Sequence, residues 1–269
     1  MLKQITSTQN TYIKELVQLK EKSRVRKKTG LFVIEGLRET VLALNGGYKL
    51  HKVLFDSSII SYDELKLNLN LDEVEVIEIS KEVYQKLALR ESTEGVLAVA
   101  YTQDLSLKNL QIFSKKPLIL VAEAPEKPGN IGALLRTADA AGIDAVLIAN
   151  PKTDMYNPNI IRTSIGTIFT TKIATGSTSQ IIDFLKHQNI NIYCAALSAS
   201  IDYLTINYTE SSAIIVGTEA TGLSDQWLQN SNQNIIISMR GCIDSMNVSV
   251  SAGIITFEAL RQRSIRNND

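Results

Sequence analysis

The chain has 269 residues, of which 44% are hydrophobic and 21% are charged, and its formal net charge at pH 7 is zero. This length suits two modest domains or one large one, and the composition is that of an ordinary globular protein. No apolar run approaches the roughly 20 residues that span a bilayer, and the N-terminus lacks a signal peptide's apolar stretch. We therefore expect a soluble, cytoplasmic protein with no membrane partner.

The cysteines and histidines do not predict a metal site. Cys194, Cys242, His51 and His187 are the complete set, and their positions lack the spacing of zinc ligands. Cys194 lies in the apolar run IYCAAL, where a buried packing role is expected. A local role for Cys242 stays open. We predict no bound metal.

The first hundred residues have the pattern of a small α/β domain, residues 1–101. Apolar residues recur at helical spacing over 7–20, and a second helical pattern, from Glu35 to Leu44, stops at Asn45-Gly46-Gly47. Apolar runs predict four strands, at 31–36, 52–55, 74–80 and 95–101, with a helix near 81–90.

A basic cluster, KEKSRVRKK, occupies residues 20–28 and has one acid among six cations. The cations are Lys20, Lys22, Arg24, Arg26, Lys27 and Lys28. Such a cluster is either a solvated surface or a docking site for nucleic acid, and composition alone leaves both open.

Residues 102–116 are polar and predict a linker with room for one helical turn. From 117 to 269 strands and helices alternate, which predicts a parallel sheet covered on both faces. The expected strands are 118–124, 145–150, 168–174, 191–197, 213–217 and 234–239. The expected helices are 130–142, 158–166, 179–188, 224–230 and 247–263.

Unusual residues gather in three segments that follow predicted strands, where open α/β sheets place their sites. In 123–142, Asn130 lies near a helix start and Arg136 follows on that helix. In 216–224, Gly217 and Gly222 allow close backbone approach to a ligand, with Glu219 between them. In 237–260, serines and asparagines gather at the start of an apolar helix. Each segment alone could be an ordinary strand-to-helix turn.

Other nucleotide-binding signatures are absent from the sequence. No GxGxxG opens the first strand-to-helix turn, and no GxxxxGK[ST] occurs. These absences argue against a dinucleotide-dependent dehydrogenase and a P-loop ATPase. Neither His51 nor His187 is near the three segments, so a Ser-His-Asp hydrolase is not supported either.

Together the segments PGNIGALLRTADAAG, VGTEATGLS and DSMNVSVSAGI resemble the three motifs of the SpoU/TrmH family of RNA ribose 2'-O-methyltransferases. NPNIIRTSIGTIF, at 157–169, fits the family pattern between the first two motifs. The first domain resembles the small RNA-binding domain that precedes the catalytic domain in many members. The resemblance implies a parallel α/β catalytic domain, residues 117–269, with a deep trefoil knot, S-adenosylmethionine as cofactor, and a homodimer.

The resemblance also implies roles for individual residues. The catalytic set would be Asn130, Arg136, Glu219, Ser245 and Asn247. The cofactor-binding set, acting largely through backbone groups, would be Leu197, Gly217, Ile237, Met239 and Met246. A guanidinium stays protonated. Arg136 is therefore better suited to binding a phosphate or stabilising the developing alkoxide than to acting as a base. Glu219 would accept the proton or orient Arg136.

The same resemblance favours the docking role for the basic cluster, since cations that contact phosphates supply most nonspecific affinity for RNA. An N-terminal RNA-binding domain favours ribosomal over transfer RNA as the substrate. Two alternatives stay open: a non-catalytic RNA-binding or ribosome-assembly factor that kept the fold, and an enzyme that methylates a base. The sequence departs mildly from the family pattern, for example with Thr218 in place of the usual Asn before Glu219.

Overall fold

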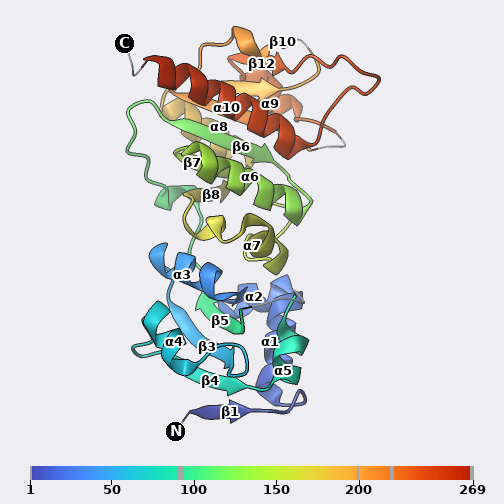
Figure 1. Ribbon diagram of the computed structural model, residues 1–269. Coiled ribbons are helices and arrows are strands. Elements are labelled where there is room, and N and C mark those ends of the chain that lie inside the picture. The colour runs from blue at the N-terminus through green and yellow to red at the C-terminus, as the bar shows by residue number, and fades with distance from the viewer. Residues whose placement is uncertain (1, 90–93, 199, 219–220, 267–269) are drawn as a thin grey trace. The chain divides into compact units, whose positions relative to one another are not determined.

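The computed structural model describes residues 2–89, 94–198, 200–218 and 221–266, without the side chains of residues 265 and 266 (Figure 1). The chain forms two compact units. Unit 1 comprises Met1–Gln103 and Asp154–Thr170, and unit 2 comprises Asp104–Thr153 and Thr171–Asp269. The domain boundaries predicted at 101 and 117 stay a prediction, but one segment differs from them, because Asp154–Thr170 belongs to unit 1.

Unit 1 is built on a mixed sheet of five strands in the order β1-β4-β3-β5-β2. β1 and β3 run parallel to β4, whereas β5 is antiparallel to β3 and β2. The strands are β1 (Lys3–Ile5), β2 (Leu31–Glu35), β3 (Leu50–Asp56), β4 (Glu75–Ile79) and β5 (Val96–Tyr101). The predicted α/β character of the first domain is confirmed.

Helices α1 and α5 bury apolar residues in one core cluster with the strands of this sheet. In α1, Ile13, Leu16 and Leu19 are buried at helical spacing, and Asn10 caps the helix by accepting a hydrogen bond from the Tyr12 amide. The helices are α1 (Thr11–Glu21), α2 (Ser23–Thr29), α3 (Leu37–Asn45), α4 (Tyr62–Asn68), α5 (Lys81–Leu87), α7 (Pro158–Ser164) and the short 3₁₀ helix η2 (Thr167–Phe169).

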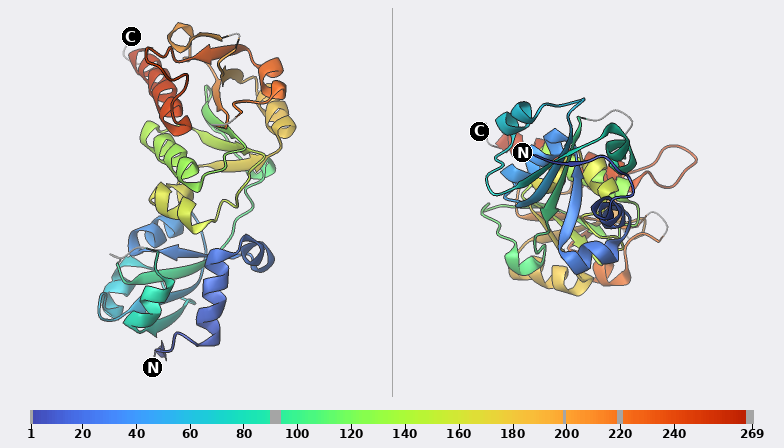
Figure 2. Two further views of the ribbon diagram at one scale, coloured as in Figure 1. Left: turned by 90° about the vertical axis from the view of Figure 1, so that its right-hand side faces the viewer. Right: turned by 90° about the horizontal axis from the view of Figure 1, so that it is seen from below.

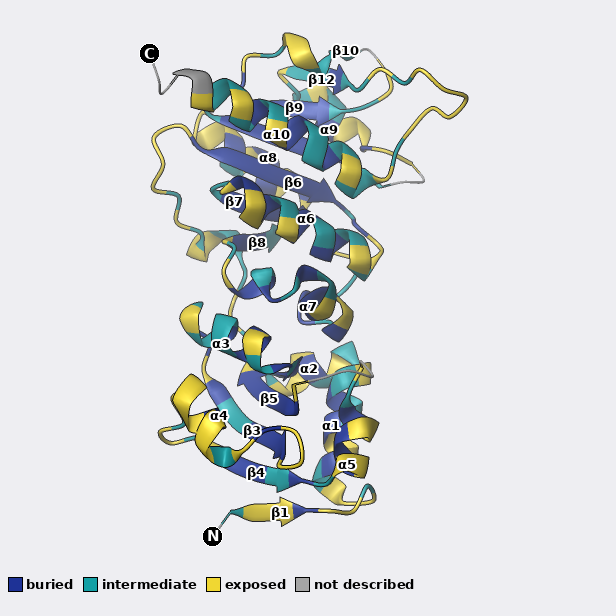
Figure 3. Ribbon diagram, in the orientation of Figure 1, coloured by how far each residue is buried: buried dark blue, intermediate teal, exposed yellow. Residues whose placement is uncertain are grey.

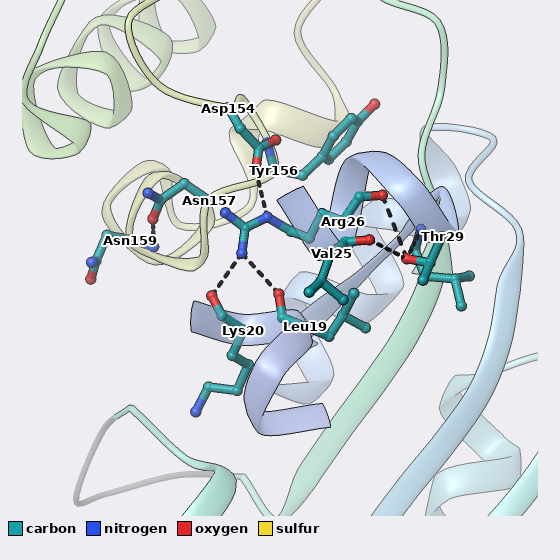
Figure 4. A network of polar contacts seen from close by, with 10 residues as sticks. Leu19, Lys20, Val25, Arg26, Thr29, Asp154, Tyr156, Asn157 and Asn159 are labelled. Carbon is teal, nitrogen blue, oxygen red and sulfur yellow. Dashed lines mark hydrogen bonds and ion pairs between the residues drawn. The ribbon is translucent and has the colours of Figure 1, made fainter. Parts of the chain in front are cut away.

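The segment Asp154–Thr170 is held in unit 1 by an aromatic cluster and a buried ion pair. The ring of Phe32 stacks on that of Tyr156 with 4.5 Å between centroids, and Phe169 stacks on Phe32 at 5.9 Å. The Arg26 guanidinium forms an ion pair with Asp154 (Figure 4). The chain enters this segment from one strand of the unit 2 sheet and continues from it into the next strand of that sheet.

Unit 2 contains seven parallel strands in the order β10-β12-β9-β11-β6-β7-β8. The strands are β6 (Leu118–Glu123), β7 (Ala145–Ala149), β8 (Ile173–Gly176), β9 (Asn191–Ala195), β10 (Ser200–Asp202), β11 (Ser212–Val216) and β12 (Gln233–Ile236). Every residue of β6, β7 and β11 is buried (Figure 3), as expected for apolar strands covered on both faces.

The helices of unit 2 cover both faces of its sheet, with α6 and α10 side by side on one face and α8 and α9 on the other (Figure 2). The elements are η1 (Leu107–Asn109), α6 (Pro128–Ala141), α8 (Thr178–His187), η3 (Tyr203–Thr205), α9 (Asp225–Asn230) and α10 (Val248–Arg266). The predicted parallel α/β fold is therefore confirmed, and the trefoil knot stays a prediction.

The C-terminal part of α10 is anchored by Arg263. Its guanidinium donates hydrogen bonds to the backbone carbonyls of Lys116, Pro117, Tyr208 and Glu210. Burial lowers the pKa of this guanidinium, yet the fork geometry of arginine still satisfies several carbonyls at once. The helix thus contacts the segment that leads into β6 and the segment that leads into β11.

Three sequence expectations differ from the structure. The strand predicted at 168–174 is largely wrong, because Ile168 and Phe169 are buried within η2 and β8 begins only at Ile173. The basic cluster, for which we predicted no helix, forms most of α2. The short elements β1, α4 and β10 were not predicted. Among the described residues, no helix is long and apolar enough to cross a membrane.

Candidate functional site

The three singled-out segments follow three of the four consecutive strands β12, β9, β11 and β6 in the sheet of unit 2. The first follows β6, the second follows β11, which pairs with β6, and the third follows β12, which lies one strand further along, beyond β9. Because all these strands are parallel, their carboxyl ends lie at one edge of the sheet. The fold thus gathers at a common edge three segments that follow strands ending at Glu123, Val216 and Ile236, as open α/β sheets do at their sites.

Asn130 and Asn247 make direct contact across this edge. The side-chain amide of Asn247 donates a hydrogen bond of 3.2 Å to the side-chain oxygen of Asn130. Asn247 also caps α10, because its side-chain oxygen accepts from the amide and hydroxyl of Ser249 at 3.0 and 2.6 Å. The first and third segments therefore meet where α6 and α10 begin.

Arg136 and Ser245, from the first and third segments, both have exposed side chains. Arg136 lies on α6, and no described carboxylate forms an ion pair with it. Ser245 donates a hydrogen bond of 3.1 Å to the Asp244 carboxylate. An exposed guanidinium of this kind is available to a phosphate or an oxyanion.

The second segment forms a tight loop after β11. Thr218 and Gly222 exchange backbone hydrogen bonds of 3.1 Å, and a Cβ on Gly217 would lie 2.3 Å from the backbone carbon of Gly222. Only glycine fits at position 217, because its Cα packs directly against the backbone of Gly222. The predicted site residue Glu219 lies outside the described residues.

Glu123, which we did not predict as a site residue, holds the base of this loop. The side chain is 6% exposed at the carboxyl end of β6. Its carboxylate accepts hydrogen bonds of 2.8 Å from the Ser224 amide, from the Ser224 hydroxyl and from the Thr178 hydroxyl. It thereby joins the end of the loop to the start of α8. The sequence signal was present, since an acid in the apolar run LILVAEA needs a partner when buried.

Replacing Glu123 with Gln is expected to weaken binding at the loop. A glutamine amide would point a donor at the Ser224 hydroxyl or amide, leaving one buried donor unpaired at a cost of about 1–3 kcal/mol. We expect S-adenosylmethionine, the cofactor implied by the resemblance, to bind roughly tenfold more weakly in titration calorimetry. Glu126→Gln, an exposed carboxylate in the same connection, is the control. Equal affinity in wild type and Glu123→Gln would contradict this positioning role.

The predicted cofactor-binding residues also follow strand ends at this edge. Gly217 follows β11 directly, Ile237 follows β12 directly, and Leu197 comes two residues after β9. Leu197 is 62% exposed, which is unusual for a leucine within a fold whose strands are otherwise buried. Met239 and Met246 are partly buried. Backbone groups and apolar side chains at one edge suit a ligand with both polar and apolar parts.

Some cations of the basic cluster are exposed, and others are hydrogen-bonded within the protein. Arg24, Lys27 and Lys28 are exposed and Lys22 is partly so. Arg26, which we predicted as part of a docking surface, is instead 3% exposed, and it donates to the Leu19 and Lys20 carbonyls at 2.8 and 2.7 Å (Figure 4).

Lys20 is also hydrogen-bonded within the protein. Its ammonium donates a hydrogen bond to the Leu87 carbonyl, and burial lowers the pKa of this ammonium. The surface available to a polyanion is therefore Lys22, Arg24, Lys27 and Lys28.

The two cysteines differ in environment. Cys194 is fully buried in the core of unit 2, and burial raises the pKa of its thiol to about 12. This agrees with the packing role expected from the run IYCAAL. Cys242 is exposed and free. Among the described residues, no group of three His, Cys, Asp or Glu side chains could hold a metal ion.

Residues 117–257 match the SpoU rRNA Methylase family, and residues 10–98 match the MRM3-like substrate binding domain. The chain belongs to the SpoU rRNA methylase family. The 23S rRNA (guanosine(2553)-2'-O)-methyltransferase RlmP of Bacillus subtilis is 29% identical to it over 259 residues. That alignment covers 95% of this chain and 98% of RlmP.

Solved structures of RNA methyltransferases are also similar to this SpoU family member. A crystal structure of an RNA 2'-O ribose methyltransferase is 38% identical, with a TM-score of 0.84, and the match covers 97% of this chain and 99% of the other. An AdoMet-bound rRNA methyltransferase from Sinorhizobium meliloti, 24% identical, shares the fold with a TM-score of 0.88 over 97% of this chain and 98% of the other. The family resemblance found in the sequence is confirmed.

Proposed function

We propose that this protein transfers the methyl group of S-adenosylmethionine to a ribose 2'-hydroxyl of ribosomal RNA. The observation that carries the proposal is the contact of Asn130 with Asn247, which joins the first and third family motifs at one sheet edge. Its relatives include the 23S rRNA 2'-O-methyltransferase RlmP. The location that this substrate implies is the cytoplasm.

The residues at the sheet edge fit the cofactor. Gly217 begins the tight loop that follows β11, and Leu197 presents an exposed apolar side chain. When bound, the cofactor supplies an electrophilic methyl group on a sulfonium. We assign Leu197, Gly217, Ile237, Met239 and Met246 to holding it, mainly through their backbones.

Methyl transfer to a hydroxyl is an in-line displacement, so orientation of the hydroxyl provides much of the rate. Arg136, exposed and always protonated, holds the neighbouring phosphate or stabilises the developing alkoxide. Asn130 and Asn247 orient the ribose next to it, and Ser245 lies two residues from Asn247. Glu219 is our candidate for the proton acceptor.

The remaining partners are the RNA body and a second copy of the chain. In unit 1, the cations that contact RNA phosphates are Lys22, Arg24, Lys27 and Lys28. On α10, Val250 is 50% exposed and Phe257 is 48% exposed, in a helix that carries Asn247 at its start. Two exposed apolar side chains seven residues apart, on one helix face, support burial of α10 in a homodimer.

The proposal is tested by transfer of labelled methyl from S-adenosylmethionine to total RNA from a strain that lacks this protein's gene. In that RNA the target site is unmodified. We expect label in a 2'-O-methyl nucleoside from ribosomal RNA. Label in a methylated base would contradict ribose transfer, and cofactor binding without labelling of any RNA would favour a non-catalytic RNA-binding factor.

A further inference from the structure

Unit 1 contains a groove whose lining residues are all its own, and none of them belongs to the site at the sheet edge of unit 2. It is bounded by α1, α2 and residues of β2, β3 and β5, and its volume is about 510 Å³. This volume is in the range of small-molecule sites. Its apolar lining consists of Leu16, Leu19, Val25, Leu31 and Val99.

Aromatic side chains stand at the groove. Tyr12 lines it, and its buried hydroxyl has no hydrogen-bond partner among the described residues. Burial, reinforced by Glu75 and Glu15, raises the pKa of Tyr12, so the hydroxyl remains a donor. Because this hydroxyl is enclosed by the protein, Tyr12 offers its ring to the groove rather than its hydroxyl.

A second aromatic pair extends the groove towards solvent. His51 lines the groove, and its Nδ1 lies 3.0 Å from the hydroxyl of Tyr101, a residue that is 45% exposed. The two rings meet edge to face with 5.4 Å between centroids. Burial and the nearby Lys52 lower the pKa of His51, which keeps the ring neutral at pH 7.

The charges around the groove favour an anionic ligand. Val25 and Thr29 of α2 face the groove, while Arg24, Lys27 and Lys28 of the same helix are exposed. No described carboxylate forms an ion pair with these three cations. Arg24 and Lys28 lie four residues apart, a repulsive spacing that a bound anion relieves.

The lining itself is close to neutral. Lys14, Lys52 and Glu15 line the groove. Lys52 is paired with Glu75 at 2.7 Å, and its ammonium lies 4.8 Å from the centre of the Tyr12 ring. The excess positive charge therefore lies on α2, beside the groove rather than inside it. This arrangement suits a ligand with a neutral flat part and an anionic part.

We propose that the groove holds one unstacked nucleobase of the RNA, with the adjoining phosphates on the exposed cations of α2. The inference rests on the proposed function, which supplies the RNA. Proteins that bind single-stranded RNA stack its bases on aromatic side chains and hydrogen-bond their edges, and here Tyr12, His51 and Tyr101 offer both. The groove would thus fix the RNA at a point separate from the site of methylation.

The test compares two short single strands of RNA on the full-length protein, one of mixed sequence and one made of abasic ribose phosphates. Val25→Phe fills the groove from α2. We expect it to weaken binding of the base-bearing strand about tenfold in fluorescence anisotropy and to leave the abasic strand unaffected, since stacking of a base is lost. Leu67→Phe, at an 87% exposed position on α4, is the matched control.

Two further variants sharpen the result. His51→Ala removes a ring and a hydrogen-bonding edge that line the groove, so it should weaken only the base-bearing strand even if Val25→Phe fails to fold. Lys28→Ala should weaken both strands, since it removes a phosphate contact. The proposal is overturned if Val25→Phe and His51→Ala bind the base-bearing strand like wild type, or if they weaken both strands equally.

Failure of this inference is distinguishable from failure of the proposed function. If wild-type protein methylates ribose while the groove variants bind RNA normally, only the groove proposal is contradicted. Wild-type protein that transfers no methyl group while Val25→Phe selectively loses the base-bearing strand would remove only the methyltransferase activity.

Discussion

Arg136→Ala is expected to lower the rate of methyl transfer by about 10²–10³-fold, because a charged group that stabilises a developing oxyanion is lost. The side chain is exposed on α6, so its removal should leave the free energy of unfolding nearly unchanged. The affinity for S-adenosylmethionine should also be preserved. Single-turnover transfer to unmodified RNA gives the rate, and calorimetry gives the cofactor affinity.

Two companion variants separate the role of Arg136 from loss of a surface charge. Arg38→Ala removes an exposed arginine from α3 and should transfer methyl at the wild-type rate. Arg136→Lys keeps the charge but not the bidentate geometry, so it should recover part of the rate. Activity of Arg136→Ala equal to wild type would exclude Arg136 from catalysis.

Asp154→Ala is expected to destabilise the protein by about 3–5 kcal/mol, because it leaves the buried Arg26 guanidinium without its counter-ion. The side chains of Arg26 and Asp154 are 3% and 8% exposed, and the carboxylate also accepts a hydrogen bond of 3.0 Å from the Tyr156 amide. Urea titration followed by circular dichroism measures the loss. No exposed pair in unit 1 should approach it.

Asp63→Ala provides the comparison, since Asp63 is 90% exposed and pairs with Lys66 at 3.4 Å. Its loss should cost less than about 1 kcal/mol. The double variant Arg26→Met with Asp154→Leu should regain most of the stability, because no charge is then buried without a partner. A cost for Asp154→Ala no greater than that for Asp63→Ala would show that the buried pair does not hold Asp154–Thr170 in unit 1.

The apolar run at 168–174 shows where local pattern misleads. Ile168 and Phe169 are as apolar as strand residues, but they pack within unit 1, where Phe169 lies beside the rings of Phe32 and Tyr48. A residue buried in a sheet and a residue buried against a neighbouring aromatic ring are both apolar, so they look alike in the sequence. Only the partner distinguishes them, and the partner here is more than 100 residues away.

The sequence by itself determined the alternation of strands and helices in unit 2, the three family motifs and the candidate residues within them. These features depend on residues a few positions apart, through side-chain periodicity, caps and turns. Tertiary structure alone decided that Asn130 meets Asn247, that Glu123 holds Ser224 and that Arg26 of the basic cluster is buried. Each of these facts joins residues about 100 or more positions apart, and packing of the whole chain, rather than local preference, brings such residues together.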